Sequence, residues 1–211
     1  MSDLLHSHLL WYLNRGTGIV LVAVLTLSVV LGVVSASGRG SRRWPRFALQ
    51  TLHRNVSVLA VGLLVAHAVT PVLDTYVNHY AQISWLDTVV PFVSHYQPLA
   101  LGLGALALDL LVVVVLTSAA RLRFGRRAWY AVHLSSYAAW GLGLLHGFLV
   151  GSDARTVWGL GVTAAAVVVV AAAGVLRLRP APQPVPEAPL EAPLEERRPT
   201  GRRAAGRRAE V

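Results

Sequence analysis

The stretch "LHRNVSVLAVGLLVAH", Leu52 to His67, is an apolar segment long enough to form most of a membrane-spanning helix, and it carries a histidine near each end. His53 and His67 are 14 residues apart. In an α-helix this spacing brings the second side chain back to within about 40° of the first and about 21 Å farther along the axis. The two imidazoles therefore share one face of a helix and lie near opposite sides of a bilayer.

The composition of the whole chain is typical of an integral membrane protein. Of its 211 residues, 55% are hydrophobic and only 14% are charged, which is unusual for a soluble domain of this size. The absence of cysteine excludes disulfides, iron–sulfur clusters and cysteine-linked haem. All 19 basic residues are arginine, and the net charge is +9. The arginines form short clusters beside apolar runs, a pattern that indicates membrane topology and not nucleic-acid binding.

Five apolar segments approach or exceed the ~20 residues that cross ~30 Å of hydrocarbon. They lie at residues 15–36, 49–73, 98–120, 128–150 and 156–176. We therefore predict an all-α integral membrane protein, with a bundle of about five transmembrane helices in a domain of residues 15–176.

The two ends of the chain differ from this domain. Residues 1–14 lack the basic start of a signal peptide, so we expect this N-terminal segment to remain in the chain. Residues 177–211 are rich in proline, glutamate and arginine, and we predict a disordered tail there. Its arginines could contact anionic membrane lipid.

Arginine sets the expected orientation of the helices. Three clusters should be cytoplasmic: "SGRGSRRWPR" (37–46), "RLRFGRR" (121–127) and "RLRP" (177–180). The segment 74–97 has no arginine and should lie outside, where its many aromatic residues favour a short amphipathic helix at the interface. We expect a multi-pass plasma-membrane protein with its N-terminus outside and its C-terminus in the cytoplasm.

Four of the eight histidines lie within the predicted spans. His53 and His67 are in the second span, and His133 and His146 are in the fourth. Both spans run from the cytoplasm outward, so His53 and His133 lie at the inner level and His67 and His146 at the outer level. If the two helices face each other, each level offers two imidazoles across a gap.

Ionisable groups inside a membrane are costly, so these histidines need a role. A single membrane histidine often only bonds a neighbouring helix, but four at matched depths favour metal ligation, for which neutral imidazole is well suited. Two facing imidazoles in apolar surroundings are typical of a bis-His macrocycle. Zinc would need further ligands at these depths, and the sequence offers none.

The pattern H-x13-H on one span and H-x12-H on a later parallel span resembles the ferric reductase-like transmembrane domain. This superfamily includes NADPH oxidases, ferric reductases and the haem-binding membrane subunit of the bacterial methionine-sulfoxide reductase system. The opening "WYLNRGTGIVLVAVLTLSVVLGV" also looks like small actinobacterial members. The resemblance covers residues 10–176 and implies two b haems, one on His53 and His133 and one on His67 and His146. His133 and His146 are 13 residues apart, about 140° around a straight helix, so a tilt or bend must compensate.

The chain departs from the best-known members of that superfamily. We expect no fused flavin or nicotinamide domain, because the sequence has no G-x-G-x-x-G after a predicted strand, and we predict five spans where those members usually have six. A separate electron donor, either a flavoprotein or membrane quinol, is therefore implied, together with an external acceptor.

Several other residues are secondary candidates. Arg54 beside His53 could pair with an inner haem propionate or with lipid phosphate, and Arg15, on the outer side, could pair with a propionate or serve packing. Asp109 lies within the third span and could orient a ligand histidine or be a neutral structural carboxyl. The outer segment could form a metal or acceptor site near the outer haem, or these residues could have no role: His79, His95, Asp74 and Asp87. Trp129, Tyr130 and Trp140 are expected to be interface anchors and packing residues.

Our first functional hypothesis is a membrane b-type cytochrome that transfers electrons across the bilayer, an oxidoreductase component. Two alternatives are open. One is a quinol-linked membrane subunit of an extracytoplasmic reductase with a single haem. The other is a non-haem metal-ion carrier or scaffold, in which the histidines bind ions or only pack.

Overall fold

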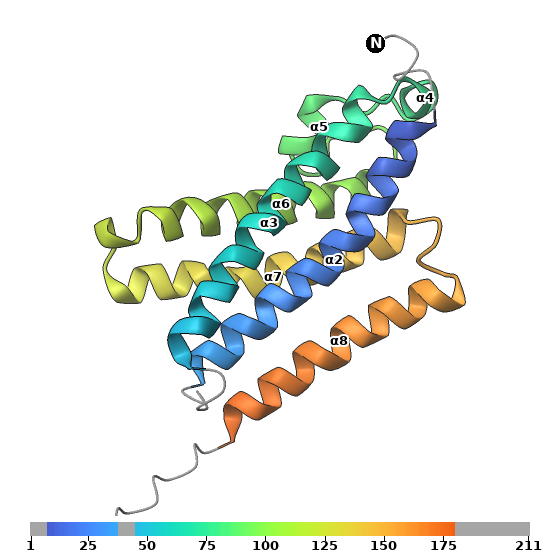
Figure 1. Ribbon diagram of the computed structural model, residues 1–211. Helices are drawn as coiled ribbons and strands as arrows, with labels where there is room; N and C mark the ends of the chain where they lie inside the picture. Colours follow the sequence, from blue (N-terminus) through green and yellow to red (C-terminus); the bar gives the residue numbers. More distant parts are fainter. Residues whose placement is uncertain (1–7, 38–44, 180–211) are drawn as a thin grey trace, which may run out of the picture. The chain divides into compact units, whose positions relative to one another are not determined.

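The computed structural model describes residues 8–37 and 45–179. Within these residues all regular structure is helical, which confirms the predicted all-α bundle (Figure 1). The five long helices are α2 (Leu9–Ala36), α3 (Arg46–Leu73), α6 (Pro98–Ala119), α7 (Arg126–Val150) and α8 (Val157–Leu178). Each corresponds to one of the five predicted apolar segments, with ends that differ by up to six residues.

Four of these helices, α2, α3, α6 and α8, are long and apolar enough to cross a membrane by length and composition. The fifth, α7, has 25 residues, enough for about 37 Å of helix. It is less apolar because it begins with two arginines and also carries two histidines and two serines. The crossing of the membrane by α7 therefore stays a prediction.

Helix α2 begins earlier than the sequence suggested. It starts at Leu9, six residues before the predicted span, so residues 9–14 belong to this helix. The run "LLWYLN" has no helix breaker and continues the apolar pattern, which explains the difference. At the other end, α8 includes residues 177 and 178, and the predicted disordered tail from residue 180 lies outside the described residues.

The outer segment between α3 and α6 forms two short helices, α4 (Thr75–Asn78) and α5 (Trp85–Val89). Asp74 begins α4 by accepting hydrogen bonds from the backbone N–H groups of Tyr76 and Val77. Ser84 and Asp87 form a capping box at the start of α5, which satisfies N–H groups that a helix end leaves free. The amphipathic helix predicted here is thus two short, separately capped helices. On the opposite side, a 3₁₀ turn (Arg121–Arg123) joins α6 to α7.

The long helices pack as two antiparallel pairs. Helix α2 lies along α3, and α6 lies along α7, while α8 packs against α2. The α2–α3 pair crosses the α6–α7 pair at an angle (Figure 1). Small side chains line the contacts: Ala139 is fully buried, and Ala105 and Ala107 are nearly so. Small residues let helices approach closely, which is how helices associate inside a membrane.

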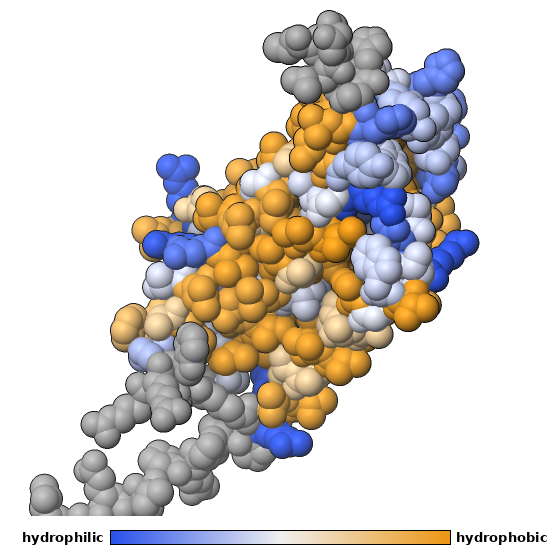
Figure 2. All heavy atoms as spheres, turned by 45° about the vertical axis from the view of Figure 1, so that its right-hand side comes forward, coloured by the Kyte–Doolittle hydropathy of each residue, from blue (hydrophilic) through white to orange (hydrophobic). Residues whose placement is uncertain are grey.

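Polar contacts between helices complete the bundle. The indole Nε1 of Trp140 in α7 donates to Thr26 Oγ1 in α2 at 3.0 Å. Arg177 near the end of α8 donates to the hydroxyl of Tyr130 in α7 at 2.6 Å. Large apolar side chains remain exposed on the outside of all five long helices, and hydrophobic residues cover most of the middle of the face in Figure 2. Such a surface is expected to contact lipid.

Candidate functional site

The four histidines of the predicted spans form two facing pairs, each with one member on α3 and one on α7. The ring centres of His53 and His133 are 6.2 Å apart, with planes at 76°. The ring centres of His67 and His146 are 6.3 Å apart, with planes at 82°. These are the pairs expected from the matched depths. Helices α3 and α7 run at an angle to each other in Figure 1, and both pairs form although His133 and His146 are about 140° apart around a straight helix.

Three of the four imidazoles are fixed by a backbone carbonyl of a neighbouring helix. His53 Nδ1 lies 2.9 Å from the carbonyl of Ser28, His67 Nδ1 lies 3.1 Å from that of Asn14, and His146 Nδ1 lies 2.7 Å from that of Ala100. A carbonyl can only accept a hydrogen bond, so Nδ1 is the donor in each pair. In a neutral imidazole this leaves the lone pair on Nε2, the atom that can bind a metal.

Glycines on the neighbouring helices make room for the same three rings. A Cβ atom added to Gly18 would lie 2.9 Å from Cε1 of His67. One added to Gly104 would lie 2.6 Å from Nδ1 of His146, and one added to Gly32 would lie 3.3 Å from Cε1 of His53. Carbon atoms normally stay about 3.5–4.0 Å apart. These three glycines therefore let the rings lie directly against the helix backbone.

The carbonyl and the glycine that hold one histidine are always four residues apart. Helix α2 carries this arrangement twice, as Asn14 with Gly18 and as Ser28 with Gly32, 14 residues farther on. The repeat matches the 14 residues between His53 and His67 on α3. Sequence reasoning missed these positions, although the equal spacing of Gly18 and Gly32 could have revealed them.

The fourth ring, that of His133, is held differently. Its Nδ1 lies 3.4 Å from the hydroxyl oxygen of Ser118 in α6. The indole of Trp129 stacks on it, with ring centres 4.9 Å apart and planes at 22°. Trp129, predicted to be an anchor or packing residue, thus contacts a candidate ligand directly.

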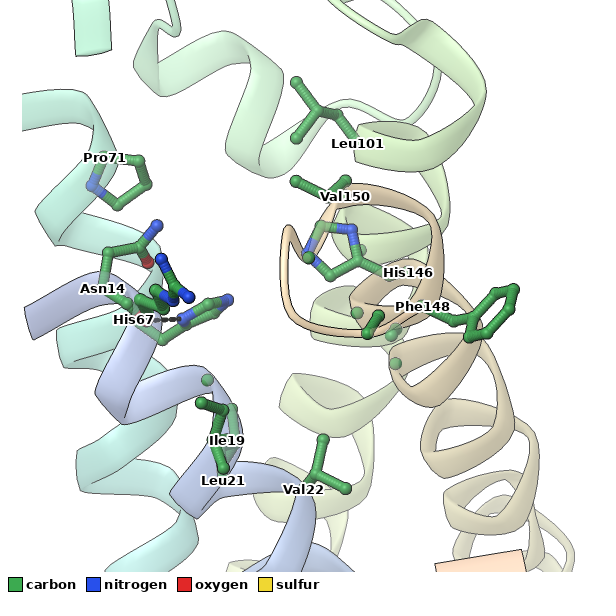
Figure 3. A pocket seen from close by; sticks show the side chains of 18 of the residues that line it. Asn14, Ile19, Leu21, Val22, His67, Pro71, Leu101, His146, Phe148 and Val150 are labelled. Atoms are coloured by element: carbon green, nitrogen blue, oxygen red, sulfur yellow. Dashed lines mark hydrogen bonds between the residues drawn. The ribbon is translucent and has the colours of Figure 1, made fainter. Parts of the chain in front are cut away.

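The outer pair lines a cavity of about 570 Å³. In Figure 3, His67 and His146 approach it from opposite sides, and Asn14 lies on the same side as His67. Apolar side chains make up most of the lining, and polar side chains of the outer segment also contribute to it. The lining residues include Leu21, Leu64, Leu101, Leu108, Trp140, Phe148, Tyr80, Asp87 and Tyr96. The cavity offers two imidazoles inside an apolar chamber.

Arg15 also lines this cavity. Its guanidinium forms a two-bond ion pair with the carboxylate of Asp153, through Nε and Nη2. It also lies 4.8 Å from the ring centre of Trp11. The partner Asp153 was not predicted, because it lies 138 residues away in the chain.

The other candidates lie apart from the histidine pairs. Arg54 is exposed on α3, one residue from His53. Asp109 is half-buried and accepts none of the four histidine hydrogen bonds, so it does not orient a ligand in this way. His79 and His95 are exposed. Among residues 8–37 and 45–179, no group of three or more His, Cys, Asp or Glu side chains could hold a metal ion.

A family model described as "Domain of unknown function (DUF8596)" matches residues 9–153. No curated protein and no solved structure matches the chain. The matched region runs from the start of α2 to just beyond α7, so it contains both histidine pairs, the residues that hold them, Arg15 and Asp153.

Proposed function

We propose that this chain, which belongs to that family, is a membrane b-type cytochrome with two bis-His haems that carries electrons across the bilayer. One observation supports this most: two levels of paired imidazoles, three of them with Nδ1 bonded to a backbone carbonyl so that Nε2 is left as the ligand atom. Metal-binding histidines in proteins typically donate their other ring N–H in this way, which fixes the ring and its tautomer.

The distance within each pair is suitable for one metal ion between two imidazoles. A bond from an imidazole nitrogen to a first-row metal such as zinc is about 2.0–2.1 Å long. The centre of a five-membered ring with sides of about 1.33 Å lies about 1.1 Å behind that nitrogen. Two imidazoles on opposite sides of a metal therefore have ring centres about 6.3–6.5 Å apart. The separations of 6.2 and 6.3 Å are close to this value.

The number of ligands favours a macrocycle over a bare ion. Each level has two imidazoles, and the described residues hold no cluster of three or more candidate ligands. A protein zinc site normally uses three or four side chains, whereas haem supplies four equatorial nitrogens itself and needs only two axial ligands. The apolar outer cavity of about 570 Å³ is also within the usual size range of cofactor sites, about 300–1,000 Å³.

The chain's own residues then bind and orient the cofactors. His53 with His133 would hold the inner haem, and His67 with His146 the outer one. Bound haem supplies reversible one-electron chemistry, and the protein sets its potential through the axial ligands, burial and hydrogen bonds. The two levels are about 21 Å apart along α3, from 14 residues at ~1.5 Å each, so together they bridge most of the hydrocarbon layer.

Two arginines are proposed to hold haem propionates. Arg15 faces the outer cavity, and Asp153 occupies two of the five N–H donors of its guanidinium. The ion pair keeps this cation in place while it still has donors for a propionate. Arg54, which follows His53 in the sequence and is exposed, is proposed for a propionate at the inner level if its long side chain turns toward that level.

The setting is proposed to be the plasma membrane, with the N-terminus outside and the C-terminus in the cytoplasm. The support is the sequence, in which the arginine clusters fall in the segments that the predicted topology assigns to the cytoplasm. Electrons would come from a separate flavoprotein or from quinol and leave to an external acceptor. This assignment agrees with the resemblance of the histidine spacing to the ferric reductase-like transmembrane domain.

Single histidine replacements test the proposal. His53→Ala and His133→Ala should each remove the same haem, and His67→Ala and His146→Ala should each remove the other. His79→Ala is the matched control and should keep both haems. If all four replacements leave the haem content per chain unchanged, the ligand assignment is wrong. A wild-type chain with one haem would favour the quinol-linked subunit, and one with none would favour the ion carrier or scaffold.

A further inference from the structure

The inner site has one ligand that is held less tightly than the others. His133 bonds a serine hydroxyl at 3.4 Å, whereas the other three histidines bond carbonyls at 2.7 to 3.1 Å. Those three rings also lie against glycines, and no glycine of the described residues would bring an added Cβ within 4 Å of His133. The orientation of this ring must come from another contact.

Trp129 supplies that contact. It precedes His133 by four residues on α7, so the two side chains lie on the same helix face. Their rings are stacked, 4.9 Å between centres and 22° between planes. The guanidinium of Arg121, from the 3₁₀ turn before α7, lies 5.6 Å from the centre of the Trp129 ring. A cation over an indole face attracts it, so Arg121 helps to hold the tryptophan in place.

The indole N–H of Trp129 has no acceptor among the described residues. Its Nε1 atom is buried and makes no hydrogen bond there. Buried indole N–H groups almost always find an acceptor, because an unpaired donor is unfavourable. Trp140 on the same helix shows the usual situation, since its Nε1 donates to Thr26. The unpaired N–H of Trp129 therefore indicates an acceptor that belongs to a bound group.

We infer that Trp129 is a positioning residue of the inner haem site, which fixes the plane of the His133 ring and donates its indole N–H to a carboxylate of the inner haem. This inference rests on the proposed function. The haem propionate is the acceptor that the proposed cofactor brings to this level, and Arg121 places a positive charge on the same side. The stacked indole of Trp129 thereby fixes the orientation of the His133 ring, which the 3.4 Å hydrogen bond to Ser118 holds only loosely.

Two substitutions separate the stacking from the hydrogen bond. Trp129→Phe keeps an aromatic ring over His133 but removes the N–H, and Trp129→Leu removes both. Trp85→Phe, on the exposed α5, is the matched control. Three quantities are measured: the amount of haem per chain, the EPR spectrum of the oxidised haems, and the midpoint potential of each haem by potentiometric titration. The EPR spectrum reports the angle between the planes of the two imidazoles that hold a haem. The inner haem is identified as the component that His53→Ala lacks.

We expect Trp129→Phe to keep two haems and the wild-type EPR spectrum but to lower the midpoint potential of the inner haem. Without the hydrogen bond the propionate keeps more negative charge near the iron, which stabilises the ferric state. Trp129→Leu should also shift the EPR signal of the inner haem and lower its occupancy below that of the outer haem. Trp85→Phe should change nothing.

Other results would overturn the inference. If both Trp129 variants bind two haems with wild-type potentials and EPR spectra, Trp129 does not position His133, and its N–H bonds another group, such as a lipid phosphate. If only the leucine variant differs, the indole N–H has no acceptor on the haem. If the wild-type protein itself binds no haem, the proposed function fails, and this inference fails with it.

Discussion

Replacing Gly104 with alanine should remove the outer haem and leave the inner one. The new Cβ atom would lie 2.6 Å from Nδ1 and 2.8 Å from Cε1 of His146, whereas such contacts normally need about 3.5 Å or more. The imidazole must therefore move away by about 1 Å. This movement weakens the 2.7 Å hydrogen bond from His146 to the carbonyl of Ala100 and takes Nε2 out of line with His67.

The size of the effect follows from these contacts. Overpacking costs about 1–3 kcal/mol, and a weakened hydrogen bond adds about 1 kcal/mol. A total of about 2–4 kcal/mol lowers the affinity for the outer haem by roughly 30- to 700-fold, at 1.4 kcal/mol per factor of ten. Haem extraction and a reduced-minus-oxidised spectrum of the purified protein then measure haem per chain, which should fall from two toward one.

Gly62→Ala is the matched control for this prediction. Gly62 is exposed on α3 and does not line the outer cavity, and a Cβ atom there would meet nothing within 4 Å, so this variant should keep both haems. If Gly104→Ala also keeps both haems, with a wild-type spectrum and a wild-type haem affinity, then the close packing of His146 on α6 does not position a ligand.

Four further substitutions and a change of pH have defined expected outcomes. Gly18→Ala should lower the affinity for the outer haem strongly, because its added Cβ atom would lie 2.9 Å from the ring of His67. Gly32→Ala should lower the affinity for the inner haem less, because its added Cβ atom would lie 3.3 Å from the ring of His53. Haem titration measures both affinities. Asp153→Asn removes the charge that pairs with Arg15 and should lower the free energy of unfolding in detergent by about 1–2 kcal/mol; an unchanged thermal midpoint would contradict this. Partial burial alone would raise the pKa of Asp87, but hydrogen bonds from the serine that caps α5 hold this pKa below its ordinary value. The carboxylate therefore stabilises α5 fully at a pH above the ordinary pKa of aspartate, and this stabilisation is lost as the pH falls through the lowered pKa. Hydrogen exchange of the α5 amides should become faster as the wild-type protein is acidified. The Asp87→Asn variant should not show this pH dependence.

The long helices and the histidine pairs could be predicted because both follow from positions along the chain. Apolar segments of about 20 residues become helices of known length, and counting along them places each histidine at a depth. His53 and His133, and His67 and His146, meet as those depths imply. What the pairs bind is not decided by this geometry, so the haems stay a prediction.

The contacts that hold the histidines could not be predicted in the same way. Which carbonyl of α2 or α6 lies beside a ring depends on how the helices cross, and the sequence pattern of one helix does not contain this information. The same limit applies to the ion pair of Arg15 with Asp153 and to the stacking of Trp129 on His133. Of these contacts, only those of Gly18 and Gly32 could have been predicted from the sequence, because the two glycines have the same 14-residue spacing as the α3 histidines.

The central claim is that the facing imidazoles are axial ligands of two haems. The most direct test is a dithionite-reduced minus oxidised spectrum of the purified full-length protein, made with haem available, together with the amount of haem per chain. Our proposal predicts the sharp bands of bis-His b haem at two haems per chain. A protein that is pure, folded and colourless would contradict it.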